Sequence, residues 1–256
     1  MLLNLLYVFL FILLLQVLFF IYAVINKTDK VTDLSYGLTF VFGSAFALFL
    51  NWGNISLFKI LLFSLIAIWG FRLAIYLFIR ILRTGKDKRF DGIREEWKRF
   101  GSFWLLQAVS VFIILLPATY TFLYPYETSL NTISVLGFIV AFIGILIEGV
   151  ADYQKFVFKN KTENKNKWIA TGLWKYSRHP NYLGEIMMWK GVFVYALVYL
   201  NDPALLTIIS PLFITYLLTK VSGIPTLEKE YEKRYADDRT YQEYKKKTGV
   251  LFPKVI

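Results

Sequence analysis

Fifteen consecutive residues, TGLWKYSRHPNYLGE at positions 171–185, hold the densest group of side chains that could do chemistry. They include the chain's single histidine, His179, directly before Pro180. Proline suits the first position of a helix, because its φ is already helical and its missing N–H would be unpaired there. The free N–H groups at a helix N-terminus attract anions. With Lys175, Arg178 and His179 in front of such a helix, the segment predicts a phosphate-binding site.

Two further polar residues, Asn181 and Glu185, stand four positions apart on the first turns of this expected helix and therefore share one face. We expect this face to contact the polar part of a ligand, with Tyr176 contributing from the preceding loop. A second interpretation is that Arg178 and His179 bind lipid headgroups. Headgroup binding does not require Asn181 or Glu185.

The apolar stretch WGFRLAIYLFIR carries Arg72, Tyr76 and Arg80 at spacings that place them on one helix face. Ionisable residues at membrane depth are costly, so each one indicates a functional role. Arg80 could instead extend to the cytoplasmic surface. Arg72 is about two turns deeper, where we expect it to face a cavity or a buried carboxylate.

Another apolar run ends in EGVADYQKFVFK, which places Glu148 and Asp152 one helical turn apart and Lys159 further along. These acids could form an internal ion pair with Arg72 or Arg80. We prefer the interpretation that they face a ligand. Two acids and a row of arginines within apolar helices predict a cavity that is open to the cytoplasm.

Several kinds of site are excluded by residue type. The chain has no cysteine and one histidine, which makes a metal site implausible, so we expect none. No GxSxG elbow is present for a nucleophilic serine. Neither GxGxxG nor a P-loop occurs, so any nucleotide must be held by a non-Rossmann site.

These polar residues must be positioned by helices in a membrane. The 256 residues are 57% hydrophobic, and apolar runs long enough to cross about 30 Å of hydrocarbon recur along the chain. We therefore expect one all-α integral membrane domain over residues 1–256, with about seven transmembrane helices, cytoplasmic loops and an interfacial helical tail. The expected spans are 3–25, 36–52, 57–79, 102–124, 132–151, 182–200 and 203–221.

The net charge of +11 is unevenly distributed. Of the 29 Lys and Arg residues, eight lie in 80–101, seven in 151–181 and nine from Lys220 onward. Three connections contain none: 52–56, 125–131 and 201–202. The positive-inside rule predicts an N-terminus outside and a C-terminus in the cytoplasm. The basic excess therefore indicates topology and contact with membrane lipids rather than nucleic acid, and no obligatory protein partner is evident.

The 171–185 segment, one span and the tail VSGIPTLEKEY…YQEYKKKTGVLFP together resemble the steroid 5-alpha-reductase family, most closely its bacterial members. The resemblance covers nearly the whole chain and includes four further motifs: DLSYG, WGFRLAIYLFIR, FWLLQ and ADYQ. It implies a seven-helix reductase, in the bacterial inner membrane, with NADPH in a cytoplasmic cavity. Hydride would pass to an activated C=C bond of an apolar substrate, a 3-oxo-Δ4-steroid or another enone lipid.

The resemblance also implies roles for individual residues. Tyr76 would polarise the substrate carbonyl. Asp33 is a candidate carboxylate partner of Tyr76, and Arg72 would adjust the properties of the Tyr76 hydroxyl. Where the family has an asparagine at the first fifth-span position, this chain has Glu148. Cofactor contacts would come from the following residues: Arg80, Glu148, Asp152, Tyr176, Asn181 and Glu185.

The main alternative is a membrane methyltransferase that uses S-adenosylmethionine, of the isoprenylcysteine carboxyl methyltransferase type. Those enzymes share the RHP-bearing helix and the C-terminal tail, and more often have a Glu-Glu pair where this chain reads LEKEYE. The face formed by Arg72, Tyr76 and Arg80 favours the reductase. A third possibility is a non-catalytic lipid-binding membrane protein.

Overall fold

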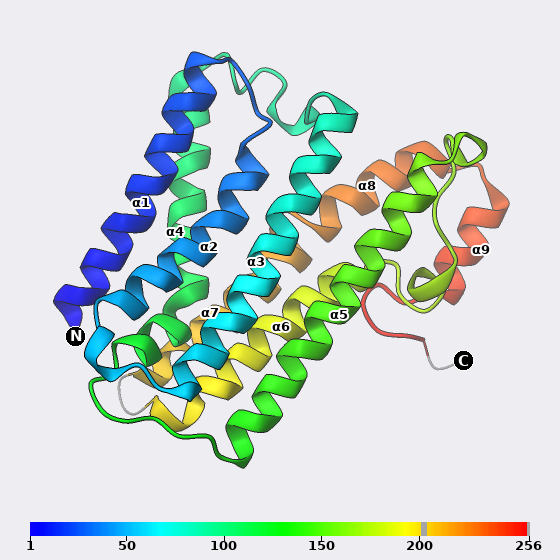
Figure 1. The fold of residues 1–256 in the computed structure, drawn as a ribbon. Helices are drawn as coiled ribbons and strands as arrows, with labels where there is room; N and C mark the ends of the chain where they lie inside the picture. Colours follow the sequence, from blue (N-terminus) through cyan, green and yellow to red (C-terminus); the bar gives the residue numbers. More distant parts are fainter. Residues whose placement is uncertain (201–203, 255–256) are drawn as a thin grey trace. The chain divides into compact units, whose positions relative to one another are not determined.

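Every regular element is a helix in the residues that the structure describes, 1–200 and 204–254 of a computed structural model, as the sequence predicted (Figure 1). Within these ranges there is no strand, and one isolated bridge pairs Ser177 with Gly249. The first residue of the expected span 203–221 and the last two residues of the chain lie outside the described part. The all-α prediction is confirmed.

Among the described residues, six helical runs are long and apolar enough to cross a membrane. Their bounds overlap the expected spans, although several runs extend further at their basic ends and the last one continues to Tyr235 where the expected span ended at 221. They are α1 (Leu2–Ile25), α2 (Thr32–Phe49), α3 (Leu57–Thr84), α4 (Trp97–Leu123), α5 (Thr132–Asn160) and the run Ala204–Tyr235.

The run Ala204–Tyr235 is not one regular helix. It begins with a 3-10 turn, Ala204–Ile208, and continues as α7 (Ile209–Tyr216), a π-helical turn (Leu217–Val221) and α8 (Ile224–Tyr235). The last helix, α9 (Arg239–Lys247), begins at Asp238, whose carboxylate accepts from the N–H groups of Thr240 and Tyr241. This cap satisfies two of the free N–H groups at the helix start.

The expected span 182–200 corresponds to α6 (Pro180–Ala196), which is not among the six runs. Its 17 residues give a length of about 26 Å, somewhat less than the hydrocarbon core. A 3-10 turn, Leu197–Tyr199, continues it. The helix begins at Pro180, as the sequence predicted.

The described chain divides into two compact units. The N-terminal unit comprises Met1–Phe138 and Val192–Ser210, and the C-terminal unit comprises Ile139–Gly191 and Pro211–Ile256. The expectation of one membrane domain over residues 1–256 stays a prediction. Each unit positions a different part of the candidate chemistry.

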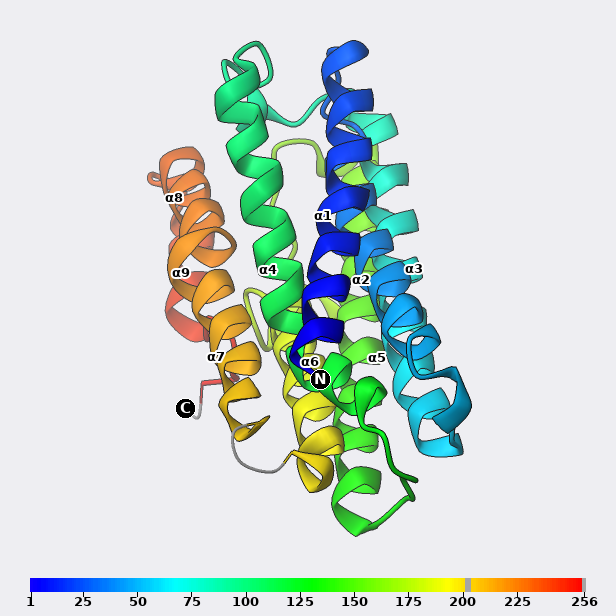
Figure 2. The ribbon, with the colours of Figure 1, turned by 90° about the vertical axis from the view of Figure 1, so that its left-hand side faces the viewer.

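In the N-terminal unit, α2 packs against α1, α3 and α4, and α1 also lies along α4 (Figure 2). The α2–α3 contact depends on two glycines. A Cβ on Gly37 would lie 2.7 Å from the carbonyl oxygen of Gly70, and a Cβ on Gly70 would lie 2.7 Å from Val41 Cγ2. Small residues of this kind let membrane helices approach closely.

A buried polar network joins α1, α2 and α4 inside this unit. The Gln107 amide donates to Gln16 Oε1 at 3.0 Å and to Ser35 Oγ at 3.0 Å, and the Gln16 amide donates to Thr39 Oγ1 at 2.7 Å. In lipid the hydrophobic effect does not drive helices together, so hydrogen bonds between helices help to hold them in contact.

Candidate functional site

In the C-terminal unit, α5 and α6 bury three carboxylates. Glu148, Asp152 and Glu185 are 2%, 4% and 8% exposed. The helices touch at Gly144 and Gly184, because a Cβ on Gly184 would lie 2.5 Å from Glu148 N and 2.6 Å from Gly144 O. The close approach places the α5 backbone at Glu148 against the second turn of α6. The two acids of α5 and the acid of α6 are therefore buried on two helices that contact each other, and their expected role in facing a ligand stays a prediction.

Asn181 lies on the first turn of α6, and its Oδ1 is buried without a hydrogen-bond partner among the described residues. A buried carbonyl oxygen without a partner is costly and is uncommon in folded proteins. This part of α6 therefore presents an acceptor suited to a donor from a ligand or water.

The two residues before α6 share one carboxylate. Glu228, on α8, accepts from Arg178 Nη1 through Oε2 at 2.5 Å and lies 2.7 Å from His179 Nε2 through Oε1. The His179 side chain is 1% exposed and the Arg178 side chain 11% exposed. Arg178 and His179, which the sequence placed at the start of α6, are thus joined to the tail by a bridging carboxylate.

Hydrogen bonds to the C-terminal tail also hold the loop that precedes α6, mainly through backbone groups. Arg178 N donates to Gly249 O at 2.9 Å, and His179 N donates to Val250 O at 3.1 Å. Tyr244 Oη donates to Trp174 O at 2.7 Å. These bonds fix the loop that leads into α6.

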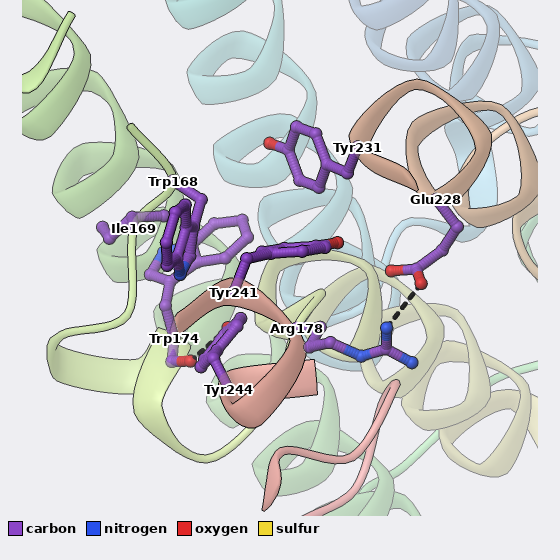
Figure 3. Close-up of a pocket in the computed structure, with 8 residues that line it drawn as sticks. All are labelled: Trp168, Ile169, Trp174, Arg178, Glu228, Tyr231, Tyr241 and Tyr244. Carbon is purple, nitrogen blue, oxygen red and sulfur yellow. Dashed lines mark hydrogen bonds and ion pairs between the residues drawn. The ribbon is translucent and has the colours of Figure 1, made fainter. Parts of the chain in front are cut away.

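Aromatic side chains line a small pocket on one side of the Arg178–Glu228 pair (Figure 3). In Figure 3 the Arg178 guanidinium points toward Glu228, while the Tyr241 ring lies between this pair and Trp168. The space enclosed is about 10 Å³, room for about one water molecule. The lining residues are Trp168, Ile169, Trp174, Arg178, Glu228, Tyr231, Tyr241 and Tyr244.

The enclosed setting shifts the titration of nearby groups. Burial lowers the pKa of His179 below its usual value, although the hydrogen bond to the Glu228 carboxylate acts in the opposite direction. Burial raises the pKa of Tyr241 to about 12, with the Glu228 charge adding to the effect. Burial also raises the pKa of Tyr244. We therefore expect a neutral imidazole and neutral phenols around Glu228 at pH 7.

Three other predicted cofactor residues face outward. Tyr176 is 58% exposed, and the Lys175 ammonium lies 5.9 Å from the centre of its ring. Lys159 donates to Lys167 O at 2.8 Å. All three side chains are exposed, whereas the carboxylates of Glu148, Asp152 and Glu185 are buried.

The remaining predicted residues belong to the N-terminal unit. Arg80 Nη2 lies 3.0 Å from Asp33 Oδ2, and Arg89 Nη2 lies 3.4 Å from Asp33 Oδ1. Asp33 therefore binds arginines at the end of α3 and in the following loop. Arg72 and Tyr76 lie on α3 at the expected spacing, and both are half-buried.

Sequence reasoning overlooked Glu228 and Arg89, which complete these two ion-pair clusters. Each belongs to a segment rich in both signs of charge, so residue type and local spacing do not distinguish it from its neighbours. The sequence predicted an interfacial helical tail, but it did not indicate that aromatic residues of this tail line a pocket.

The chain matches the family described as "Protein of unknown function (DUF1295)" over residues 19–248. It belongs to that family. Among curated proteins it is similar to the "Probable O-methyltransferase ustE" of Ustilaginoidea virens, with 39% identity over 64 residues. The match covers 25% of this chain and only 22% of that relative, so it concerns one segment of both. No solved structure matches the chain.

Proposed function

We propose that this chain is a membrane-embedded reductase that uses NADPH to reduce an activated C=C bond in an apolar substrate. A 3-oxo-Δ4-steroid or another enone lipid has the required chemistry. The observation that carries the proposal is the buried set of acceptors on α5 and α6. It consists of three carboxylates and the unpartnered Oδ1 of Asn181.

These residues fit the polar half of a nicotinamide nucleotide. Ribose hydroxyls and a carboxamide supply hydrogen-bond donors, while carboxylate and amide oxygens accept them. Glu148, Asp152, Asn181 and Glu185 would hold that half of the cofactor. Arg178, whose Nε–H has no hydrogen-bond partner among the described residues, would contact a phosphate beside the α6 N-terminus.

The residues of the chain have separate tasks in the proposed reaction. When bound, the reduced nicotinamide supplies a hydride to the β-carbon of the enone. Negative charge then develops on the substrate carbonyl oxygen, and the hydroxyl of Tyr76 would stabilise it by donating a hydrogen bond. Apolar helix surfaces would bind the substrate's hydrocarbon and exclude water.

Ligand binding to the purified protein in detergent tests the proposal. We expect saturable NADPH binding that exceeds the binding of S-adenosylmethionine, together with NADPH oxidation when an apolar enone is added. Asn181→Ala should weaken NADPH binding about tenfold, because the ligand donor that would bond to the Asn181 amide oxygen is left unpaired. Asn160→Ala is the matched control, since the Asn160 amide is exposed and bonds within its own helix.

A second candidate, an S-adenosylmethionine-dependent methyltransferase, is favoured by the local similarity to a probable O-methyltransferase. Preferential, saturable binding of S-adenosylmethionine would replace the reductase proposal with this one. Binding of neither cofactor would favour a lipid-binding protein without catalytic activity.

A further inference from the structure

His179 combines three features that an anion-binding cation does not need. It is the only histidine in the sequence, and its side chain is 1% exposed. Its Nε2 lies 2.7 Å from Glu228 Oε1. Its Nδ1 is buried and has no hydrogen-bond partner among the described residues.

The partner of Nε2 determines what Nδ1 can do. A carboxylate oxygen accepts hydrogen bonds, so the proton of a neutral imidazole must be on Nε2. Nδ1 then carries a lone pair and acts as an acceptor. Arg178 holds the other oxygen of Glu228 at 2.5 Å, which fixes the carboxylate in the orientation that receives Nε2–H.

We propose that Glu228 holds His179 as the Nε2–H tautomer, and that Nδ1 accepts a hydrogen bond from a hydroxyl of the bound ligand. The ligand class follows from the proposed function: a nucleotide cofactor offers ribose hydroxyls. A phosphate oxygen is excluded at Nδ1, because a lone pair and an anionic oxygen repel each other. The phosphate contact expected from the sequence is then assigned to Arg178 alone, and His179 becomes a hydroxyl-recognising residue.

The charged groups around His179 are consistent with a neutral ring. Glu228 faces it from α8, Lys155 from α5 and Arg178 from the same loop. Burial and the two cations lower the pKa of His179, and only Glu228 raises it. The stacked ring of Tyr182, 5.7 Å away, adds an apolar surface on one side.

The single histidine makes a direct test practical. Protein grown with ¹⁵N-labelled histidine gives one pair of imidazole nitrogen resonances. At pH 7.5, without ligand, we expect a protonated Nε2 and an unprotonated Nδ1. A protonated Nδ1, in either the other tautomer or the imidazolium form, would overturn the proposal without any mutation.

Two variants examine the part played by Glu228. In Glu228→Gln the amide can donate to Nε2, so the population of the Nδ1–H tautomer should rise. Glu230→Gln is the control, because Glu230 lies on the same helix and pairs with Arg234 at the exposed surface. If Glu228→Gln folds and keeps the parent tautomer, Glu228 does not set it.

Ligand titrations separate this inference from the proposed function. NADPH should move the Nδ1 resonance toward the protonated position, whereas inorganic pyrophosphate should not move it. NADPH binding without a change at Nδ1, or an equal change with pyrophosphate, would overturn the hydroxyl contact and leave the reductase proposal standing. A change caused by S-adenosylmethionine, in protein that does not bind NADPH, would support the hydroxyl contact and refute the reductase.

Discussion

At the scale of single residues, the proposed chemistry depends most on Tyr76. Its position on α3, one turn from Arg72 and one from Arg80, is compatible with a hydrogen-bond donor or with a packing residue. Tyr76→Phe keeps the ring and removes the hydroxyl. If Tyr76 polarises the substrate carbonyl, turnover should fall on the order of 100-fold with little change in NADPH affinity. Steady-state kinetics with an apolar enone give the measurement, and turnover within about twofold of the parent would make Tyr76 a packing residue.

A second residue-scale prediction concerns pH and stability. The pKa of His179 is lowered by burial in the folded protein, while an unfolded histidine titrates near about 6.5. Between these two values the unfolded chain binds more protons, so the free energy of unfolding decreases as pH falls. We expect the melting temperature in detergent to drop as the pH is lowered from about 7.5 to below 6.5.

The non-titrating variant His179→Gln is the comparison for this effect, and its melting temperature should depend less on pH over the same window. Acids with lowered pKa values outside the membrane, such as Asp87 and Asp238, act only below their ordinary value of 3.8. They therefore do not overlap with the histidine window. Identical pH dependence in parent and variant would show that His179 does not control stability there.

At the scale of helices, the α5–α6 contact should be the least tolerant of added volume. In Gly184→Ala the new methyl would meet backbone atoms of Glu148 and Gly144, which cannot rotate away. Overpacking of this kind costs about 1–3 kcal/mol. We expect a clear fall in melting temperature and weaker NADPH binding, because the buried acids are carried by these two helices. Gly53→Ala, with open space around the glycine, should behave like the parent.

The sequence predicted helices better than it predicted contacts between them. Pro180 marks the start of α6 through a local preference of its own backbone, and the structure confirms that start. The bond between Arg178 and Glu228 joins residues 50 positions apart, and Arg80 pairs with Asp33 across 47 positions. Such pairs depend on how helices pack, and no local spacing encodes them. The resemblance implied Asp33 as a partner for Tyr76, whereas the Asp33 carboxylate forms ion pairs with Arg80 and Arg89.

At the scale of the whole molecule, the distribution of charge predicts how the chain crosses the membrane. Within the N-terminal unit, the connection before α2 meets the basic loop after α3, where Asp29 pairs with Arg94 at 3.2 Å. At the other end of these helices, Ser56 and Thr128 are 2.5 Å apart through their hydroxyl oxygens. The connections there, 52–56 and 125–131, contain no Lys or Arg. The two ends of this unit therefore differ in charge as the positive-inside rule requires.

The absence of cysteine turns this orientation into a direct experiment, because the parent chain gives no background with a thiol reagent. Glu127→Cys and Lys165→Cys each place one thiol at an exposed position, the first in a connection without Lys or Arg and the second in a basic loop. In intact bacterial cells, a membrane-impermeant maleimide should label Glu127→Cys and spare Lys165→Cys. After lysis both should react equally, which controls for local accessibility. The reverse pattern would place the α6 N-terminus, with Arg178 and His179, outside the cytoplasm, away from the cellular supply of NADPH. It would thereby refute the orientation and the reductase proposal together.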